Sequence, residues 1–193
     1  MNTLVWKRLP GLALLLCLSG QASAFTVGGM VLDEKIQVNK TNLVLNGAGV
    51  RSKVIINVYV GALYLRAKKT TADAVLADTG TKRVSLRILR HLSAGDFMDA
   101  FNKAINANHT PEEYAPLAGR LIRFGRVFRD VGEVERGAVI DIDYMPETHE
   151  TVLTVNGKER TRVQGADFYT AMLKIWLGKN PVQESLKRAM LGG

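Results

Sequence analysis

Two polar side chains near the front of the chain have types and spacing suited to holding an anion. Arg51 follows the stretch Gly47-Ala48-Gly49, and Tyr59 lies eight residues further on. Because strand side chains alternate between faces, an even separation places both on one face of an unbroken strand, although a bulge would break that parity. A guanidinium and a phenol supply donors that suit a carboxylate or an enolate oxygen. Purely structural roles, with Arg51 paired to an acidic residue of the chain, remain the open alternative.

Other catalytic and cofactor chemistry finds little support in the residue pattern. The chain has no G-x-S-x-G sequence, and its one cysteine, Cys17, lies in an apolar stretch near the N-terminus. His91, His109 and His149 are scattered, without a motif for a catalytic base or a zinc site. Glycine pairs such as Gly28-Gly29 lack the spacing of nucleotide-binding loops. We therefore expect no metal and no cofactor.

Basic residues recur every three positions along one predicted helix, at Arg120, Arg123, Arg126 and Arg129. Such a face could attract an acidic partner or anionic lipid headgroups. Few aromatic residues accompany these charges, so we do not expect stacking on nucleic acid bases. We interpret the face as mainly solvated. The alternatives are weak contact with a membrane surface and a partner-binding module of the cell envelope.

Most of the first half of the chain is predicted to form strands. Val54 to Leu65 is rich in β-branched and aromatic residues, and both of its faces are mainly apolar, which is typical of a covered central strand. Gly47 and Gly49 are expected to interrupt the chain before it. Asn156-Gly157 predicts a two-residue hairpin turn. The other predicted strands are 35–38, 42–46, 82–90 with one solvated face, 138–144 and 151–155.

Apolar residues at helical spacing follow in the middle and at the end of the chain. Ser93 with Asp96, and Thr110 with Glu113 after Pro111, have the pattern of helix N-caps. One side of the second helix is an apolar stripe expected in the core, namely Leu117, Leu121, Phe124 and Phe128. Further helices are predicted over 70–78, with Gly80 as a left-handed cap, 166–177 and 182–191. This order of elements predicts an α+β fold with a largely antiparallel sheet.

The N-terminal segment 1–24 has the composition of a signal peptide. A basic start at Lys7 and Arg8 precedes an apolar run over 12–18, and Ala22-Ser23-Ala24 supplies small residues for cleavage. Leu16 before Cys17 disfavours lipidation. Cleavage after Ala24 would leave 24 basic and 18 acidic residues, a net charge of +6. We expect a periplasmic protein without a transmembrane segment.

The length and composition are those of one globular domain. The 193 residues are 47% hydrophobic and 23% charged, and 26 basic residues against 18 acidic ones give a net charge of +8. These values exclude disordered, collagen-like and coiled-coil classes. We therefore assign residues 25–193 to a single domain.

Motifs at both ends of the domain resemble those of the chalcone isomerase family, specifically its bacterial chalcone isomerase-like members. They are LNGAGVR at 45–51, YVGALYL at 59–65, LGKNP at 177–181 and Leu186-Lys187. The resemblance implies an open-faced β-sandwich, in which a large antiparallel sheet is covered by a layer of helices with a ligand cleft between them. It also implies that Arg51 matches the catalytic arginine of the plant enzymes, which close a chalcone into a flavanone.

The other matched positions depart from the enzyme pattern. Tyr59 stands where the enzymes have threonine, Phe97 stands where they have tyrosine, and the helical asparagine falls near Ala104, with Asn102 close by. Lys174 corresponds to a further polar position. The missing hydroxyl of Phe97 removes a group that would orient water or polarise the ketone.

An arginine with a tyrosine in place of threonine is similar to the fatty-acid-binding branch of that family. The resemblance therefore implies a non-catalytic protein that binds a small amphipathic carboxylate, such as a fatty acid, in an apolar cleft with Arg51 and Tyr59 at the polar end. The alternative is an intramolecular lyase of the chalcone-flavanone isomerase type, in which Arg51 is catalytic.

Overall fold

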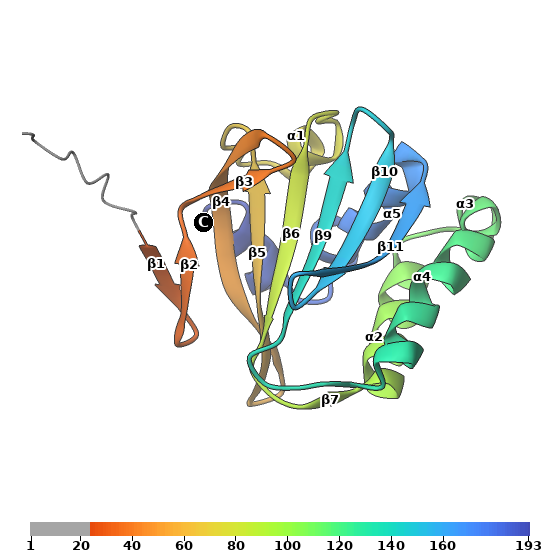
Figure 1. Ribbon diagram of the computed structural model, residues 1–193, viewed down its shortest axis with the longest axis horizontal. Coiled ribbons are helices and arrows are strands. Elements are labelled where there is room, and N and C mark those ends of the chain that lie inside the picture. Colours follow the sequence, from red (N-terminus) through yellow and green to blue (C-terminus); the bar gives the residue numbers. More distant parts are fainter. Residues whose placement is uncertain (1–23) are drawn as a thin grey trace, which may run out of the picture.

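The computed structural model describes residues 24–193. A large antiparallel sheet is flanked by helices (Figure 1), which confirms the predicted α+β, open-faced sandwich architecture. The predicted signal peptide lies outside the described residues except for Ala24, so its cleavage stays a prediction. Within residues 24–193, no helix combines the length and the apolar character that crossing a membrane would require.

The main sheet contains seven strands in the order β11-β10-β9-β6-β5-β4-β3. Its strands are β3 (Lys35–Val38), β4 (Thr41–Lys53), β5 (Ile56–Leu65), β6 (Lys82–Ile88), β9 (Val139–Met145), β10 (Glu150–Val155) and β11 (Lys158–Gln164). Two small two-stranded ladders join β1 (Ala24–Val27) to β2 (Met30–Asp33) and β7 (Leu92–Ser93) to β8 (Glu133–Val134). The helices are α1 (Ala72–Leu76), α2 (Ala94–Ala107), α3 (Pro111–Tyr114), the 3-10 turn η1 (Ala115–Leu117), α4 (Ala118–Val131), α5 (Ala166–Leu177) and α6 (Glu184–Met190).

Each face of the sheet carries its own apolar cluster. On one face, Leu86 and Ile140 of the sheet are buried together with Phe124 and Phe128 of α4 and Phe168 of α5. The cluster on the other face is formed by side chains of β2, β4 and β5, where the β1–β2 hairpin covers part of the sheet: Leu32, Leu43, Leu45, Ala48, Val60, Ala62 and Tyr64. Burial of these side chains is the main term that stabilises the fold.

The two predicted helix N-caps and the predicted hairpin turn are confirmed. The Ser93 hydroxyl accepts a hydrogen bond from Asp96 N at 3.1 Å, and Thr110 with Glu113 forms a complete capping box. Asn156 and Gly157 have φ of 50° and 75°, as the predicted two-residue turn between β10 and β11 requires. The cap predicted at Gly80 is wrong, because α1 ends at Leu76 with Ala77 as its C-cap, and Gly80 has no positive φ.

Two glycines predicted to interrupt the chain instead lie inside β4. Gly47 and Gly49 pair with Leu63 and Gly61 of β5, and α6 packs directly over them. A Cβ atom on Gly47 would overlap the carbonyl oxygen of Ala189, and one on Gly49 would lie 2.7 Å from the Ala189 Cβ. Glycine is used here for the close approach of a helix, and not to end a strand.

The face of β6 predicted to be solvated is only partly exposed, because Ser85 is buried and Arg83 and Arg87 are half-buried. Ser85 is 1% exposed and donates to Asp141 at 2.6 Å, and Arg83 donates to both oxygens of Asp143 at 2.6 Å. The bonds of Ser85 and Arg83 to the acidic residues of β9 let this part of the face leave water, whereas the buried Nε of Arg87 has no hydrogen-bond partner among the described residues.

The arginine face of α4 is only partly solvated. Arg123, Arg126 and Arg129 are exposed, as predicted, but Arg120 donates to Asp167 Oδ1 at 2.7 Å and lies over the Phe168 ring at 5.8 Å. Arg120 therefore ties α4 to the start of α5.

Lys82 is a buried cation at the start of β6. It is 3% exposed, its Nζ donates to the carbonyl oxygen of Asp78, and it lies 5.3 Å and 5.7 Å from the ring centroids of Tyr144 and Tyr169. Desolvation by burial lowers the pKa of Lys82 to about 8, against the opposing attraction of Asp78.

We expect the free energy of unfolding to rise between about pH 8 and pH 10. In that window Lys82 is deprotonated in the folded state but protonated in the unfolded state, so a higher pH favours folding. The rise should be about 1 kcal/mol after allowance for solvent screening. Urea unfolding of Lys82→Met across this range should show no such rise, and an unchanged pH profile in that variant would contradict the assignment.

Candidate ligand-binding site at Arg51 and Tyr59

Arg51 and Tyr59 lie side by side on two neighbouring strands. β4 ends at Lys53, Val54 and Ile55 form a turn, and β5 begins at Ile56, so the predicted continuous strand is wrong. Arg51 and Tyr59 are direct cross-strand partners in the β4–β5 ladder, and such partners project from the same face of a sheet. The two side chains therefore share a face by cross-strand pairing, not by the parity of one strand.

The Arg51 guanidinium has neutral partners. Its Nη1 donates to Gln183 Oε1 at 3.2 Å and to the carbonyl oxygen of Ser52. Gln183 is held in place because its Oε1 also accepts from Ser52 N at 2.9 Å and its Nε2 donates to Val50 O at 3.1 Å. Among residues 24–193, no Asp or Glu forms an ion pair with Arg51. The positive charge of this partly buried group is thus not neutralised within the described chain.

Tyr59 is fixed from the helix side. Its hydroxyl oxygen accepts a hydrogen bond from Trp176 Nε1 of α5 at 3.0 Å. Desolvation by burial raises the pKa of Tyr59 to about 12, although the bond from Trp176 and the charge of Arg51 act in the opposite direction. The phenol is therefore neutral at physiological pH and keeps its own proton to donate.

The pair presents a permanent cation and a neutral donor on one face of the sheet. The hydrogen bonds of Arg51 within the described chain all use Nη1, so its Nε and Nη2 remain to bind an oxygen ligand. A carboxylate accepts several such bonds at once, and bonds to a charged donor are the stronger kind. The arrangement therefore suits an anionic oxygen group.

The other predicted site residues engage different groups. Phe97 on α2 stacks on Phe128 of α4, with ring centroids 4.2 Å apart, and belongs to the packing of the helical layer. Asn102 is exposed on α2. Lys174 on α5 lies 3.6 Å from Glu113 Oε1. None of the three forms a hydrogen bond or an ion pair with Arg51 or Tyr59 among the described residues.

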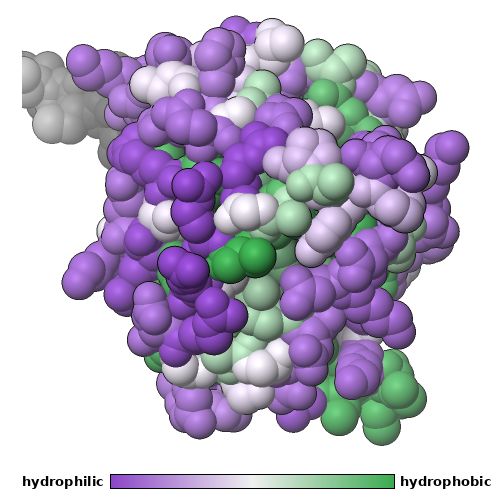
Figure 2. Space-filling model, turned by 90° about the vertical axis from the view of Figure 1, so that its right-hand side faces the viewer, coloured by the Kyte–Doolittle hydropathy of each residue, from purple (hydrophilic) through white to green (hydrophobic). Residues whose placement is uncertain are grey.

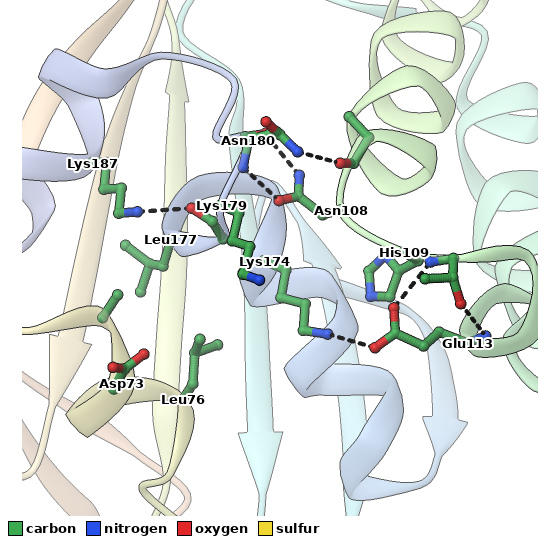
Figure 3. A pocket seen from close by; sticks show the side chains of 14 residues that line it. Asp73, Leu76, Asn108, His109, Glu113, Lys174, Leu177, Lys179, Asn180 and Lys187 are labelled. Atoms are coloured by element: carbon green, nitrogen blue, oxygen red, sulfur yellow. Dashed lines mark hydrogen bonds and ion pairs between the residues drawn. The ribbon is translucent and has the colours of Figure 1, made fainter.

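A pocket of about 540 Å³ lies where the C-terminal ends of α2 and α5 meet α1, and Lys174 is part of its wall (Figure 3). Lys187 Nζ donates to Gly178 O at 2.7 Å, and Asn108 and Asn180 exchange bonds of 2.7 Å and 3.0 Å. Neither Arg51 nor Tyr59 lines this pocket. It is thus a concave surface that carries lysines and is separate from the Arg51 site.

Near the β7–β8 ladder, His91 lies close to two acidic residues. Its Nδ1 lies 3.3 Å from Glu135 and its Nε2 lies 3.9 Å from Glu133, and all three residues are exposed. The 3.3 Å contact between the His91 ring and Glu135 accounts for this exposed group as a surface hydrogen bond.

Sequence reasoning missed Gln183 and Trp176, the two residues that orient the pair. Gln183 has no local signal, because it lies 132 residues from Arg51 along the chain. Trp176 carries a weak signal: a buried indole needs a partner for its N–H, and the residues on either side of Trp176 are buried and apolar.

Comparisons with known proteins agree with this architecture. The sequence profile of a family described as chalcone isomerase-like matches residues 24–192. A solved fatty-acid binding protein of Arabidopsis thaliana is similar in fold, with a TM-score of 0.67 and 15% sequence identity, over 88% of this chain and 96% of that one. No curated protein matches the sequence.

Proposed function

Because the chain belongs to the chalcone isomerase-like family, we propose that it is an exported, non-catalytic protein that binds a small amphipathic carboxylate such as a fatty acid. The carboxylate would be held by Arg51 and Tyr59. The observation that carries the proposal is the cross-strand pairing of these two residues, with no acidic partner for Arg51 in the described chain. Export is supported by the signal-peptide composition of residues 1–24.

Three further features favour binding over catalysis. Tyr59 has its pKa raised to about 12 by burial, so it serves as a fixed donor and not as a base near neutral pH. Phe97 offers no hydroxyl and is held in a stack with Phe128. The solved protein of similar fold is itself a fatty-acid binding protein.

The apolar tail would need a surface next to the pair. Tyr59 packs against the helix-side core, and Leu186 of α6 covers Gly61, where a Cβ would lie 3.5 Å from the Leu186 Cδ1. We propose that the tail lies along this apolar seam between β5 and α6. Leu186 is 1% exposed, so a bound tail would have to displace its side chain from the close-packed seam.

Arg51→Ala should weaken the binding of dodecanoate, measured by isothermal titration calorimetry, by at least about tenfold, since it removes the charge-assisted bonds. Tyr59→Phe should have a smaller effect, because it removes one neutral donor. The methyl ester of dodecanoate should bind the wild-type protein weakly. Its affinity for the wild type and for Arg51→Ala should be the same.

Lys174→Ala is the matched control, because it removes a cation from the separate pocket at the ends of α2 and α5. It should leave dodecanoate affinity unchanged. If Lys174→Ala abolishes binding and Arg51→Ala does not, the carboxylate site is misplaced. If the wild-type protein binds neither dodecanoate nor longer-chain acids, the proposed function itself is wrong.

A further inference from the structure

The turn between β4 and β5 exposes three consecutive aliphatic side chains. Val54, Ile55 and Ile56 are 93%, 90% and 48% exposed, and we call them the hairpin tip. Figure 2 shows strongly hydrophobic side chains standing out from the lower edge of the molecule, the edge at which Figure 1 places the end of this hairpin. Most large aliphatic side chains of the described chain are buried, so a protruding group of three requires an explanation.

The backbone of the hairpin tip is strained at Val54. Val54 has φ of 59°, a region that β-branched residues adopt only at a cost. Lys53 pairs with Ile56, so Val54 and Ile55 form a two-residue turn in which only the first residue has a positive φ. Glycine is the residue that such a turn favours at that position. A strained and exposed valine points to a role outside the folding of the chain.

The charges around the tip match a lipid surface. Residues 51–60 contain Arg51 and Lys53 and no acidic residue, and the chain as a whole carries a net charge of +8. Aliphatic side chains that enter the boundary between headgroups and acyl chains need no complementary shape, and flanking basic residues attract anionic headgroups. A second copy of the chain is a poorer occupant, because a stable interface buries about 800 Å² on each partner, more than three side chains supply.

From these observations we propose that the hairpin tip inserts into the surface of a lipid bilayer that contains anionic lipids, with Val54 and Ile55 below the headgroups and Lys53 at their level. The proposal does not depend on the ligand of the Arg51 site. It does place that site at the lipid interface, since Arg51 lies on the same hairpin, three residues before Val54.

The test is flotation of the purified protein, with its N-terminus established by mass spectrometry, on vesicles of phosphatidylethanolamine and phosphatidylglycerol. The double variant Val54→Ser with Ile55→Ser should reduce the bound fraction at least about tenfold, because each buried aliphatic side chain contributes that order of affinity. Ile122→Ser is the matched control, since Ile122 is 55% exposed beside the arginines of α4. That control should bind as the wild type does.

Two single variants guard against effects of unfolding. Val54→Gly should keep or raise the melting temperature, because it relieves the strained turn, and should still weaken flotation. Ile55→Trp should bind, and its fluorescence should be quenched by brominated lipid. The proposal is overturned if the wild type does not float, if the double variant floats as the wild type does, if the tryptophan is not quenched, or if Ile122→Ser alone abolishes binding.

Discussion

Arg83→Leu should lower the free energy of unfolding at neutral pH by about 3 kcal/mol, the largest single effect that we expect. Arg83 donates to both oxygens of Asp143 at 2.6 Å and lies 3.2 Å from Asp141 Oδ2, and the two carboxylates are only 3% and 9% exposed. Removing the guanidinium would leave two buried negative charges beside each other. Breaking a buried ion pair from one side is strongly destabilising for this reason.

The loss should shrink as the pH falls. Burial already raises the pKa of Asp143, while the hydrogen bond and charge of Arg83 lower it. Without Arg83 the folded-state pKa rises further above the unfolded value, so the folded state takes up protons first and gains stability as the pH falls toward about 5. Urea unfolding at pH 7 and pH 5 measures this change.

The double variant Arg83→Leu with Asp143→Leu is the control for charge. It removes both partners and should be less destabilised than the single variant, because replacing a whole buried pair by apolar residues is often close to neutral. Equal losses in the single and double variants would mean that packing of the Arg83 stem, and not the unpaired charge, determines the effect.

Gly47→Ala should destabilise the protein by about 2 to 3 kcal/mol, the cost expected for overpacking against main-chain atoms that cannot rotate away. Its Cβ would overlap the Ala189 carbonyl oxygen and lie 2.9 Å from Gly192 N. The neighbouring Asn46 is 3% exposed and donates to Met190 O at 2.8 Å, so any shift of α6 also breaks a buried hydrogen bond. We therefore expect the C-terminal helix to loosen.

The same shift should reach the candidate site, because Gln183, which bonds Arg51, immediately precedes α6. Hydrogen exchange should show faster exchange in α6 and near Ser52, together with the lower stability in urea. Gly119→Ala is the matched control: no atom lies within 4 Å of its Cβ position, and it lies in α4. It should be neutral or stabilising by up to about 1 kcal/mol. Equal losses in the two variants would argue against a specific clash at Gly47.

Local sequence signals predicted much of the secondary structure. The hydroxyls of Ser93 and Thr110 cap their helices, the Asn156-Gly157 turn joins β10 to β11, and α5 has its predicted bounds at 166–177. Each of these features depends on groups a few residues apart, so a short stretch of chain contains all the physics that it needs. The fold was predicted from the motifs by their resemblance to a known family, and not from local physics.

The amino-acid sequence alone determined that an arginine and a tyrosine near the front could hold an anion. Only the tertiary structure decided how they meet. The turn at Val54 and Ile55 makes them partners across the β4–β5 ladder. Gln183 and Trp176, which lie near the other end of the chain, orient them by hydrogen bonds. The tertiary structure also decided that α6 packs on Gly47 and that the polar face of β6 is partly buried. These features depend on which distant groups come together, and packing and hydrogen bonding across the fold select them, not the local preferences of the residues.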